Sequence, residues 1–534
     1  MLLVLSWWLV CATVMVRGDD AASVVCRRSG STYACDTPSE DYNQSGWTAR
    51  GTMVMGTLNK TGWGTLDVET SEDTIGEQSA SSSALKAYAA GFIEGHISAE
   101  QINLFWQSNQ FNPKPKVVEF VNAQNAWMEE NVLGHSVNES STPGYWDSVG
   151  ASLMQLRGLA DGYNAKKPEM KLTYAQFEYL QLQVELGDIE RAVYPTSRVN
   201  TLNMSDDELM RFRLKTLHCS AIFKVTSSLE EVYASHVTWS GYTVMSRMVK
   251  TYTFPFESSK AKAIKFSGYP GTLAGIDDFY ITSQNLAVIE TTNGVYNNAL
   301  FDNITPATVP YWVRVMVANR LASSSPEWHS VFYNFNSGTY NNQWMTFDYK
   351  LFQSGKPLVD NTFVVSEQLP GHFHVEDQTM ALQRNYWPSY NEIFYEDLYK
   401  LAGYPGAVAK YGVSRSYQMA PRARIFRRDA GSIESLGDLE KFMRMNHYKN
   451  SPADPLAPTP VAAISARGDL LSPPEMFGAI DGKIVSSELM KKFQIHAISG
   501  PTHETQSVFS WSPKANQSLH YGQPLSFPFQ WIDL

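Results

Sequence analysis

Cysteine is scarce in this sequence, which has 4 in 534 residues. Cys11 lies in an N-terminal segment that we expect to be removed, and Cys26 and Cys35 are close enough to pair across a short polar loop. Cys219 is then an odd thiol, and an odd thiol in a chain bound for an oxidising compartment is a candidate reactive cysteine. Spacing alone favours the alternative, in which Cys219 is a buried cysteine without a chemical role.

Long apolar runs are also absent beyond the N-terminus. No later segment reaches the length of a transmembrane helix. Residues 1–18 contain an apolar core too short to span a bilayer and followed by small residues, which predicts a secretory signal peptide cut near Gly18. Six Asn-x-Ser/Thr sequons fit a lumenal glycoprotein. They are Asn43, Asn59, Asn138, Asn203, Asn303 and Asn516.

The chain lacks a block of lysines and arginines. It has 43 Lys and Arg against 53 Asp and Glu, a formal net charge of −10, so we expect no nucleic-acid partner. Hydrophobic residues make up 43% of the chain, which is enough for a sizeable core. The length fits two or three domains, or one large α/β unit.

Several enzyme motifs are missing as well. There is no G-x-S-x-G, H-E-x-x-H or Walker A sequence, which disfavours an ordinary α/β-hydrolase lipase, a zinc protease and a P-loop enzyme. The sequence His372-Phe373-His374 alone is a weak metal signal, so we expect neither a metal nor a cofactor. A lone cysteine and a candidate histidine remain.

Helical and extended patterns are segregated along the chain. Apolar periodicity predicts helices over 84–93, 117–128, 146–159, 177–186 and 312–321, and β-branched and aromatic runs predict strands over 264–268, 279–282, 286–294, 341–349 and 363–365. Residues 190–218 form a polar connector that leads to Cys219. Predicted helices dominate the chain before Cys219, predicted strands dominate after it, and helices then return. This order favours a layered α/β sandwich over alternating βαβ units.

Two strand-like limbs follow the connector and predict a β-hairpin. They run from Leu217 to Val225 and from Glu231 to Trp239, with a serine pair between them. A turn centred on that pair places Cys219 opposite His236, with Cβ atoms about 5 Å apart. A slip of one residue would send the two side chains to opposite faces, so their proximity is a hypothesis about register.

Six short motifs resemble the phospholipase B-like proteins from about residue 35 to the C-terminus. They are Cys219-Ser220-Ala221, the His236-x-x-Trp239 spacing, Thr291-Thr292-Asn293, Asn342-Gln343-Trp344-Met345, Ser389-Tyr390-Asn391 and the run Pro421–Asp429. The resemblance implies an N-terminal-nucleophile (Ntn) hydrolase with a four-layer αββα sandwich. Such a protein is made as a precursor that cuts itself before the nucleophile, here between His218 and Cys219.

The resemblance also implies how the chain is divided. The signal peptide would occupy residues 1–18, the N-terminal chain residues 19–218 with a connector or pro-segment over about 190–218, and the C-terminal chain residues 219–534. We expect the two chains to stay associated in one Ntn unit, either in the lysosome lumen or secreted. Whether they are trimmed further, and whether the unit forms a homodimer, stays open.

A new N-terminal cysteine can act as nucleophile and carry its own base. The thiolate attacks, and the α-amino group, with a reference pKa near 8, takes the thiol proton. By resemblance to bile-salt-type Ntn hydrolases, His236 and Trp239 stand where those enzymes place Arg and Asp. Asn391 and either Thr291 or Thr292 are candidate oxyanion donors, and Arg422 is the candidate residue that orients the site or stabilises charge.

Other roles for these residues compete with the catalytic ones. The two threonines could be plain strand residues, and most of the four arginines between 422 and 428 are expected at the surface or in salt bridges. Two function classes follow. The first is a deacylase that cleaves acyl ester or amide bonds of a lipid or N-acyl small molecule. The second is a lumenal glycoprotein that matures but mainly binds lipid or serves a structural role.

Overall fold

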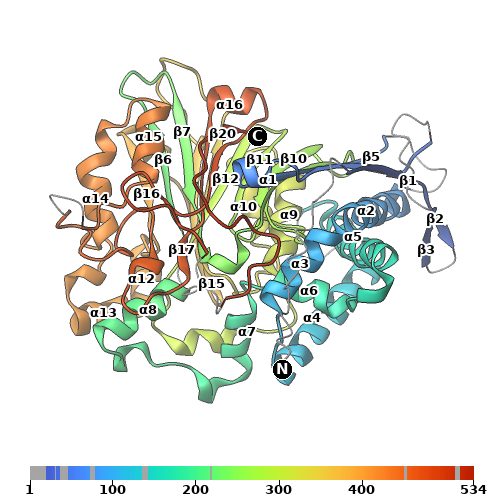
Figure 1. Ribbon diagram of the computed structural model, residues 1–534, viewed down its shortest axis with the longest axis horizontal. Coiled ribbons are helices and arrows are strands. Elements are labelled where there is room, and N and C mark those ends of the chain that lie inside the picture. Colours follow the sequence, from blue (N-terminus) through green and yellow to red (C-terminus); the bar gives the residue numbers. More distant parts are fainter. Residues whose placement is uncertain are drawn as a thin grey trace, which may run out of the picture.

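The computed structural model describes residues 20–29, 32–36, 46–72, 79–134, 142–216, 219–449, 454–511 and 518–534. The predicted signal peptide, three of the sequons (Asn43, Asn138 and Asn516) and His218 lie outside these residues. Across the described ranges, no helix is both long and apolar enough to cross a membrane. The strands gather into two large sheets (Figure 1).

Within the described residues, the larger sheet has ten strands, which come from both the N-terminal and the central parts of the chain. Its order is β1 (Asp20–Val24), β4 (Ala49–Val54), β5 (Trp63–Thr70), β9 (Arg247–Thr253), β10 (Ala263–Gly268), β11 (Phe279–Thr282), β12 (Leu286–Thr292), β13 (Asn342–Asp348), β14 (Phe363–Leu369) and β15 (His372–Asp377). Neighbours are antiparallel except β5 and β9, which pair in parallel from Trp63↔Arg247 to Glu69↔Thr253. Strands from before and after Cys219 therefore share one sheet.

The second sheet contains the predicted hairpin. Its order is β16 (Tyr386–Ser389), β6 (Ser220–Val225), β7 (Val232–Val237), β18 (Asp481–Ser486), β19 (His496–Ser499) and β20 (Ile532–Asp533). Two small ribbons join β8 (Trp239–Gly241) to β17 (Phe477–Ala479) and β2 (Cys26–Ser29) to β3 (Thr32–Cys35). A disulfide between Cys26 and Cys35, the pair suggested by their spacing, links β2 to β3.

Helices cover the outer faces of the sheets. The described helices are α1 (Leu58–Thr61), α2 (Ser79–Ile97), α3 (Ala99–Asn109), α4 (Pro115–Gly134), α5 (Tyr145–Lys166), α6 (Tyr174–Leu182), α7 (Leu186–Val193), α8 (Asp206–Thr216), α9 (Tyr311–Leu321), α10 (Ser325–Phe332), α11 (Thr379–Gln383), α12 (Glu396–Leu401), α13 (Tyr404–Tyr411), α14 (Pro421–Asp429), α15 (Leu436–Met443) and α16 (Ser487–Lys491). The predicted helices over 84–93, 117–128, 146–159 and 312–321 are confirmed, whereas the one over 177–186 is divided between α6 and α7.

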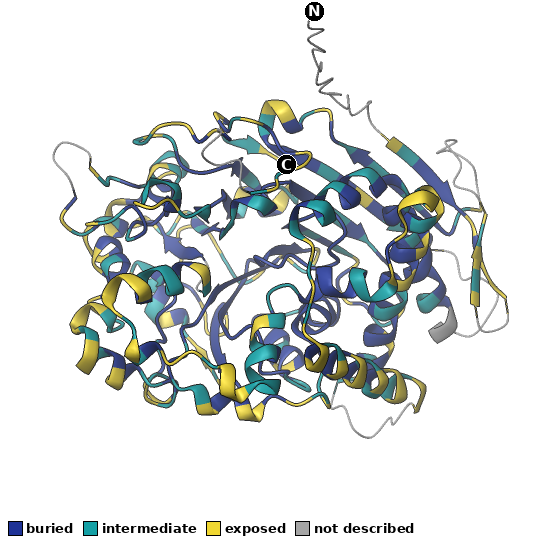
Figure 2. Ribbon diagram, turned by 60° about the horizontal axis from the view of Figure 1, so that its bottom comes forward, coloured by how far each residue is buried: buried dark blue, intermediate teal, exposed yellow. Residues whose placement is uncertain are grey.

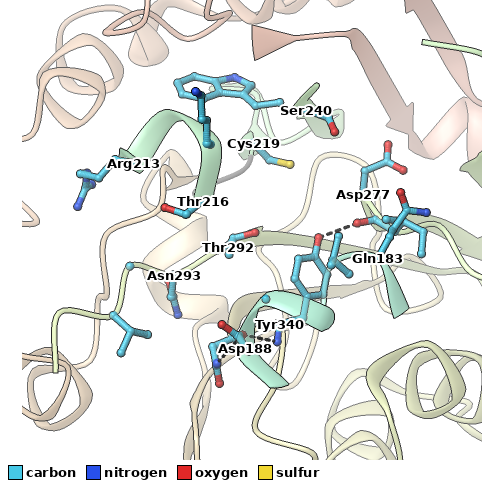
Figure 3. A pocket seen from close by; sticks show the side chains of 18 of the residues that line it. Gln183, Asp188, Arg213, Thr216, Cys219, Ser240, Asp277, Thr292, Asn293 and Tyr340 are labelled. Carbon is cyan, nitrogen blue, oxygen red and sulfur yellow. Dashed lines mark hydrogen bonds between the residues drawn. The ribbon is translucent and has the colours of Figure 1, made fainter. Parts of the chain in front are cut away.

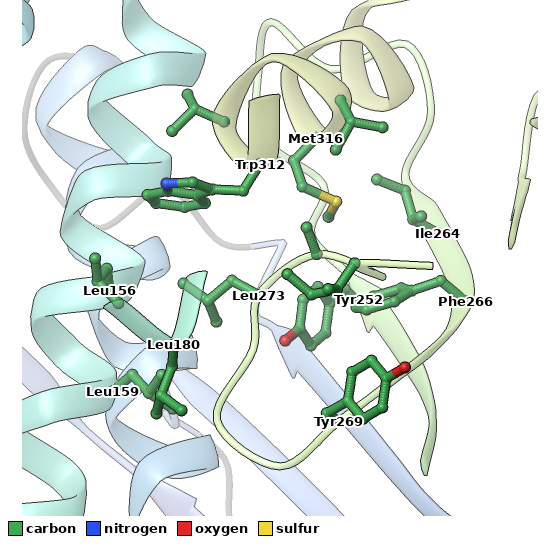
Figure 4. Close-up of a cluster of buried hydrophobic side chains, with 14 of the residues drawn as sticks. Leu156, Leu159, Leu180, Tyr252, Ile264, Phe266, Tyr269, Leu273, Trp312 and Met316 are labelled. Carbon is green, nitrogen blue, oxygen red and sulfur yellow. The ribbon is translucent and has the colours of Figure 1, made fainter. Parts of the chain in front are cut away.

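Three hydrophobic clusters fix the order of the layers. Side chains such as Leu156, Leu180, Phe266 and Trp312 join the N-terminal helices and α9 to one face of the ten-stranded sheet (Figure 4). Phe223 of β6 packs with Phe347 and Phe363 of the larger sheet, their ring centroids 6.1 and 4.8 Å away, so the two sheets face each other. The outer face of the six-stranded sheet packs against α14 and α15. The mixed α/β class is thus confirmed.

Close contact between α2 and α5 sets the layer of helices over the larger sheet. A Cβ added at Gly91 would lie 1.9 Å from the Gln155 carbonyl oxygen, and one at Gly158 would lie 2.0 Å from the Tyr88 carbonyl oxygen. Only glycine allows the two backbones to approach this closely. Buried residues concentrate on the inner sides of the helices and along the strands (Figure 2).

Candidate active site around Cys219

Cys219 directly precedes β6, the strand Ser220–Val225 of the six-stranded sheet. Its side chain is fully buried and its thiol is free. Its φ angle is +85°, a left-handed conformation in which an L side chain crowds its own backbone. Conformational strain of this kind costs on the order of 1–3 kcal/mol and concentrates at functional sites.

The register of the hairpin differs from the predicted one by two residues. Ala221, not Cys219, faces His236 across β6 and β7. The chain reverses through the loop 227–230, in which Leu229 has φ +59°, instead of a two-residue turn. Because side chains alternate between faces, a shift of two keeps Cys219 and His236 on the same face.

His236 and Cys219 therefore still meet, and a third side chain joins them. The Cys219 Sγ, a His236 ring nitrogen and a Glu290 carboxylate oxygen all lie within 4.8 Å of one another, and all three residues are buried. Glu290 belongs to β12 of the facing sheet. Its carboxylate accepts a hydrogen bond of 2.9 Å from the Tyr340 hydroxyl.

Arg422 holds the backbone at the nucleophile. From α14, its guanidinium donates to the Cys219 carbonyl oxygen at 2.7 Å and to the Ser220 hydroxyl at 3.0 Å. Its centre also lies 4.2 Å from the Trp239 ring centroid, a cation–π contact. Arg422 is 9% exposed, whereas Arg424, Arg427 and Arg428 are exposed residues of the same helix.

Asn391 extends this network to the larger sheet. Its Oδ1 accepts from the second guanidinium nitrogen of Arg422 at 2.5 Å, and its Nδ2 donates to the Thr292 carbonyl oxygen at 2.7 Å. The φ angle of Asn391 is +69°, which asparagine tolerates better than most residues. Thr291 is turned toward Ser389, with their hydroxyl oxygens 2.6 Å apart. All six sequence-predicted side chains thus lie in one region.

A buried network of four charged side chains lies near the Cys219 thiol. The carboxylates of Asp277 and Asp481 accept hydrogen bonds of 2.5 and 2.7 Å from the Arg247 guanidinium. The Lys483 ammonium lies 2.9 and 3.0 Å from the same two carboxylates. Thr238 donates its hydroxyl to Asp277 at 2.6 Å. The charges are paired two against two, which makes their burial tolerable.

Burial controls the protonation of the three clustered side chains. Burial, with the Glu290 carboxylate nearby, raises the pKa of the Cys219 thiol well above its usual range, although a backbone hydrogen bond from Trp239 opposes the shift. Burial also lowers the pKa of His236 well below its usual value, with Lys483 adding to the effect. The pKa of Glu290 is raised by burial and by Asp278. In this state, the chain holds a neutral thiol next to a neutral imidazole.

A cavity of about 350 Å³ opens directly onto Cys219. Figure 3 shows the sulfur pointing into it, with Asp277, Thr292, Asn293 and Tyr340 around the same space. The hydroxyl of Thr292 and both polar side-chain atoms of Asn293 make no hydrogen bond to the described protein. Thr292, and not Thr291, therefore presents its hydroxyl where a bound ligand would lie.

A second cavity, of about 530 Å³, lies on the other side of Trp239. Trp239 and Arg213 line both cavities, and other residues of α8 line one cavity or the other. The helix belongs to the polar connector of residues 190–218, in which no helix was predicted. The Ser205 hydroxyl accepts a hydrogen bond from the Glu208 backbone N–H, and the Glu208 carboxylate accepts one of 2.8 Å from the Ser205 backbone N–H. This pair of hydrogen bonds is a capping box, which starts the helix.

Sequence reasoning missed several residues of the site. Glu290 and Lys483 look like ordinary strand residues, and Tyr340 and Asp277 follow no motif, so no local signal marks them. Asn293 was part of a quoted motif but received no role. These side chains are brought to Cys219 only when the two sheets face each other.

Comparison with known proteins identifies the family. The phospholipase B family model matches residues 50–534. The chain is 38% identical to phospholipase B-like protein B of Dictyostelium discoideum, over 86% of this chain and 82% of that protein. It is 35% identical to phospholipase-B 81 of Drysdalia coronoides (90% and 87% covered) and to human phospholipase B-like 1 (89% and 85% covered). Together with the site geometry, these matches show that the chain belongs to the phospholipase B-like family.

Proposed function

We propose that this protein is a self-processing Ntn hydrolase that uses Cys219 as its nucleophile and cleaves acyl ester or amide bonds of lipids. The observation that carries the proposal is the strained, buried thiol that faces a cavity and lies beside the His236 imidazole. Relatives named phospholipases B favour a lipid substrate. Two facing sheets between helical layers fit the four-layer αββα sandwich of the Ntn type.

Maturation would begin at the precursor's own peptide bond. In the precursor the Cys219 nitrogen is an amide and cannot serve as base, so neutral His236 takes the thiol proton. The thiolate attacks the His218 carbonyl carbon, and the carbon–nitrogen bond breaks as the Cys219 nitrogen gains a proton. Water then hydrolyses the thioester, which restores the thiol and leaves a free α-amino group. The Cys219 conformation would be relieved as its preceding peptide bond disappears.

The same groups would then deacylate a substrate. The α-amino group takes the thiol proton, and the thiolate attacks the acyl carbonyl. A threonine of β12 is the proposed oxyanion donor, and the orientation of Thr292 toward the cavity favours it over Thr291. Asn391 does not line that cavity, and its Nδ2 already donates to the Thr292 carbonyl oxygen, so its proposed role is to hold the end of β12 in place. Arg422, stacked on Trp239, would keep the Cys219 backbone in place.

Helix α8 fits the proposed pro-segment. It lies in the connector of about residues 190–218 and lines both cavities, so its displacement after cleavage would join them beside Cys219. The two chains would stay together, because β5 of residues 19–218 pairs with β9 of residues 219–534 inside the larger sheet.

We further propose that the protein is a glycoprotein of the lysosome lumen or is secreted. Asn59, Asn203 and Asn303, the three sequon asparagines within the described ranges, are all exposed. Digestion of the mature protein with an N-glycosidase should therefore remove mass equal to several glycans, as measured by mass spectrometry. Unmodified sequons in protein purified from the secretory pathway would contradict this address.

Turnover of defined acyl compounds tests the proposed activity. A matched pair with the same acyl chain, one an ester phospholipid and one an N-acyl amide, is incubated with the mature protein before and after thiol alkylation. Cys219 is the free cysteine of the described chain, so complete labelling should add one reagent per molecule and abolish turnover. Unchanged turnover after complete labelling would contradict the thiol mechanism. Lipid binding without turnover by the unlabelled protein would favour a binding role.

A further inference from the structure

The cluster of Cys219, His236 and Glu290 has the composition of a metal site. Thiolate, imidazole and carboxylate are the groups that bind Zn²⁺ in proteins. Within the described residues, this is the one group of three or more such side chains whose ligand atoms come within 4.8 Å of one another. The three side chains come from two facing sheets, so neither sheet forms the cluster alone.

Unsatisfied polar atoms inside the cluster give a second, independent observation. The His236 imidazole is fully buried and contacts the Glu290 backbone, but neither ring nitrogen makes a hydrogen bond of normal length and angle to the described protein. The second carboxylate oxygen of Glu290 has no such partner either. Buried polar atoms are nearly always satisfied, so a group of unsatisfied ones at one point requires an explanation.

The surrounding charge also suits a divalent cation. Arg247 and Lys483 balance Asp277 and Asp481. Adding a Cys219 thiolate and a Glu290 carboxylate would leave a local charge of about −2. A divalent ion would neutralise that charge, and the cavity on the Cys219 side offers room for a fourth ligand such as water.

We propose that Cys219 Sγ, a His236 ring nitrogen and the Glu290 carboxylate bind one divalent cation of the Zn²⁺ class, and that this ion inhibits the protein. Bond lengths of about 2.0–2.3 Å require the three atoms to move slightly closer than they lie here. An ion bound to the sulfur ties up the electron pair that would attack a carbonyl. Binding itself does not depend on the proposed hydrolase function, whereas the inhibition rests on it.

Binding must also release at least one proton for each ion bound, because cysteine coordinates a metal ion as the thiolate. A site made of surface carboxylates would release about none.

Cobalt titration of the full-length protein tests the binding. The expected result is one Co²⁺ per molecule, a thiolate-to-cobalt charge-transfer band, and at least one proton released per ion. Cys219→Ala should remove the band and weaken binding by about 100-fold, and the conservative Glu290→Gln should weaken it by about 10-fold. Exposed His372→Ala and Glu376→Gln serve as matched controls and should bind as wild type. Absence of the band, or unchanged Co²⁺ affinity in Cys219→Ala, would overturn the site.

A separate experiment tests inhibition. Zn²⁺ at the concentration that saturates the site should stop precursor cleavage, and a chelator should restore it. Cobalt binding to Cys219 in a protein that never cleaves itself would support the metal site and contradict the self-processing function. Cleavage that continues with the site saturated would overturn the inhibition.

Discussion

The Cys219→Ala protein is expected to remain a single chain, while the wild type separates into residues 19–218 and residues 219–534, the latter 316 residues long. The variant lacks the only atom that can attack the His218 carbonyl from residue 219, so cleavage should be lost completely. The change removes one sulfur atom and should leave the fold intact. Intact mass under denaturing conditions distinguishes one chain from two.

Two controls make this result specific. Cys219→Ser keeps a weaker nucleophile and should cleave slowly, whereas an external protease would cut Cys219→Ala and Cys219→Ser alike. Without denaturant, the two wild-type chains should elute together, since β5 and β9 pair across the cut. Cleavage of Cys219→Ala at the same bond would remove the main support for self-processing.

The hairpin shows which features of the structure the local sequence can predict. Strand propensity located both limbs, and the relation between Cys219 and His236 survived because a register error of two residues preserves the face. The serine pair suggested a two-residue turn, but the structure uses four loop residues with Leu229 in a left-handed conformation. Nothing in the local pattern marks Leu229 for that role, because left-handed residues are usually glycine or asparagine.

The connector shows a signal that was present and overlooked. Ser205-Asp206-Asp207-Glu208 has the spacing of a capping box, and acidic residues begin α8 while Arg213 and Lys215 end it, in accord with the helix dipole. The high polarity of this segment instead led to the prediction of a polar connector over residues 190–218. The helix is polar because it lies at the edge of two cavities and buries few side chains.

The parts of the site that could not be predicted depend on sheet stacking. No sequence motif marks Glu290 as a neighbour of Cys219, and Lys483 lies 264 residues after Cys219 in the chain. Both reach the thiol because β12 and β18 belong to different sheets that meet at this point. Composition and spacing carry no information on such contacts, whereas the motif around Arg422 was long enough to indicate its place.

Arg422→Ala is expected to lower kcat by about 100-fold, because a small displacement of the nucleophile has effects of that size. It would also lower the free energy of unfolding by about 2–3 kcal/mol, since three buried acceptors lose their donor. These acceptors are the Cys219 carbonyl, the Ser220 hydroxyl and Asn391 Oδ1. Single-turnover kinetics and denaturant unfolding measure the two effects.

The same helix supplies the matched controls for Arg422. Arg424→Ala removes an exposed arginine two residues away and should change stability by less than about 0.5 kcal/mol and leave kcat unchanged. Arg422→Lys keeps the charge but cannot reach Cys219 and Asn391 together, because an ammonium lacks the planar fork of a guanidinium, so rescue should be partial. A positioning role predicts a lower kcat with little change in KM. If Arg422→Ala and Arg424→Ala had equal kcat, Arg422 would be a structural residue only, and the geometry of Cys219 would have to depend on β6 alone.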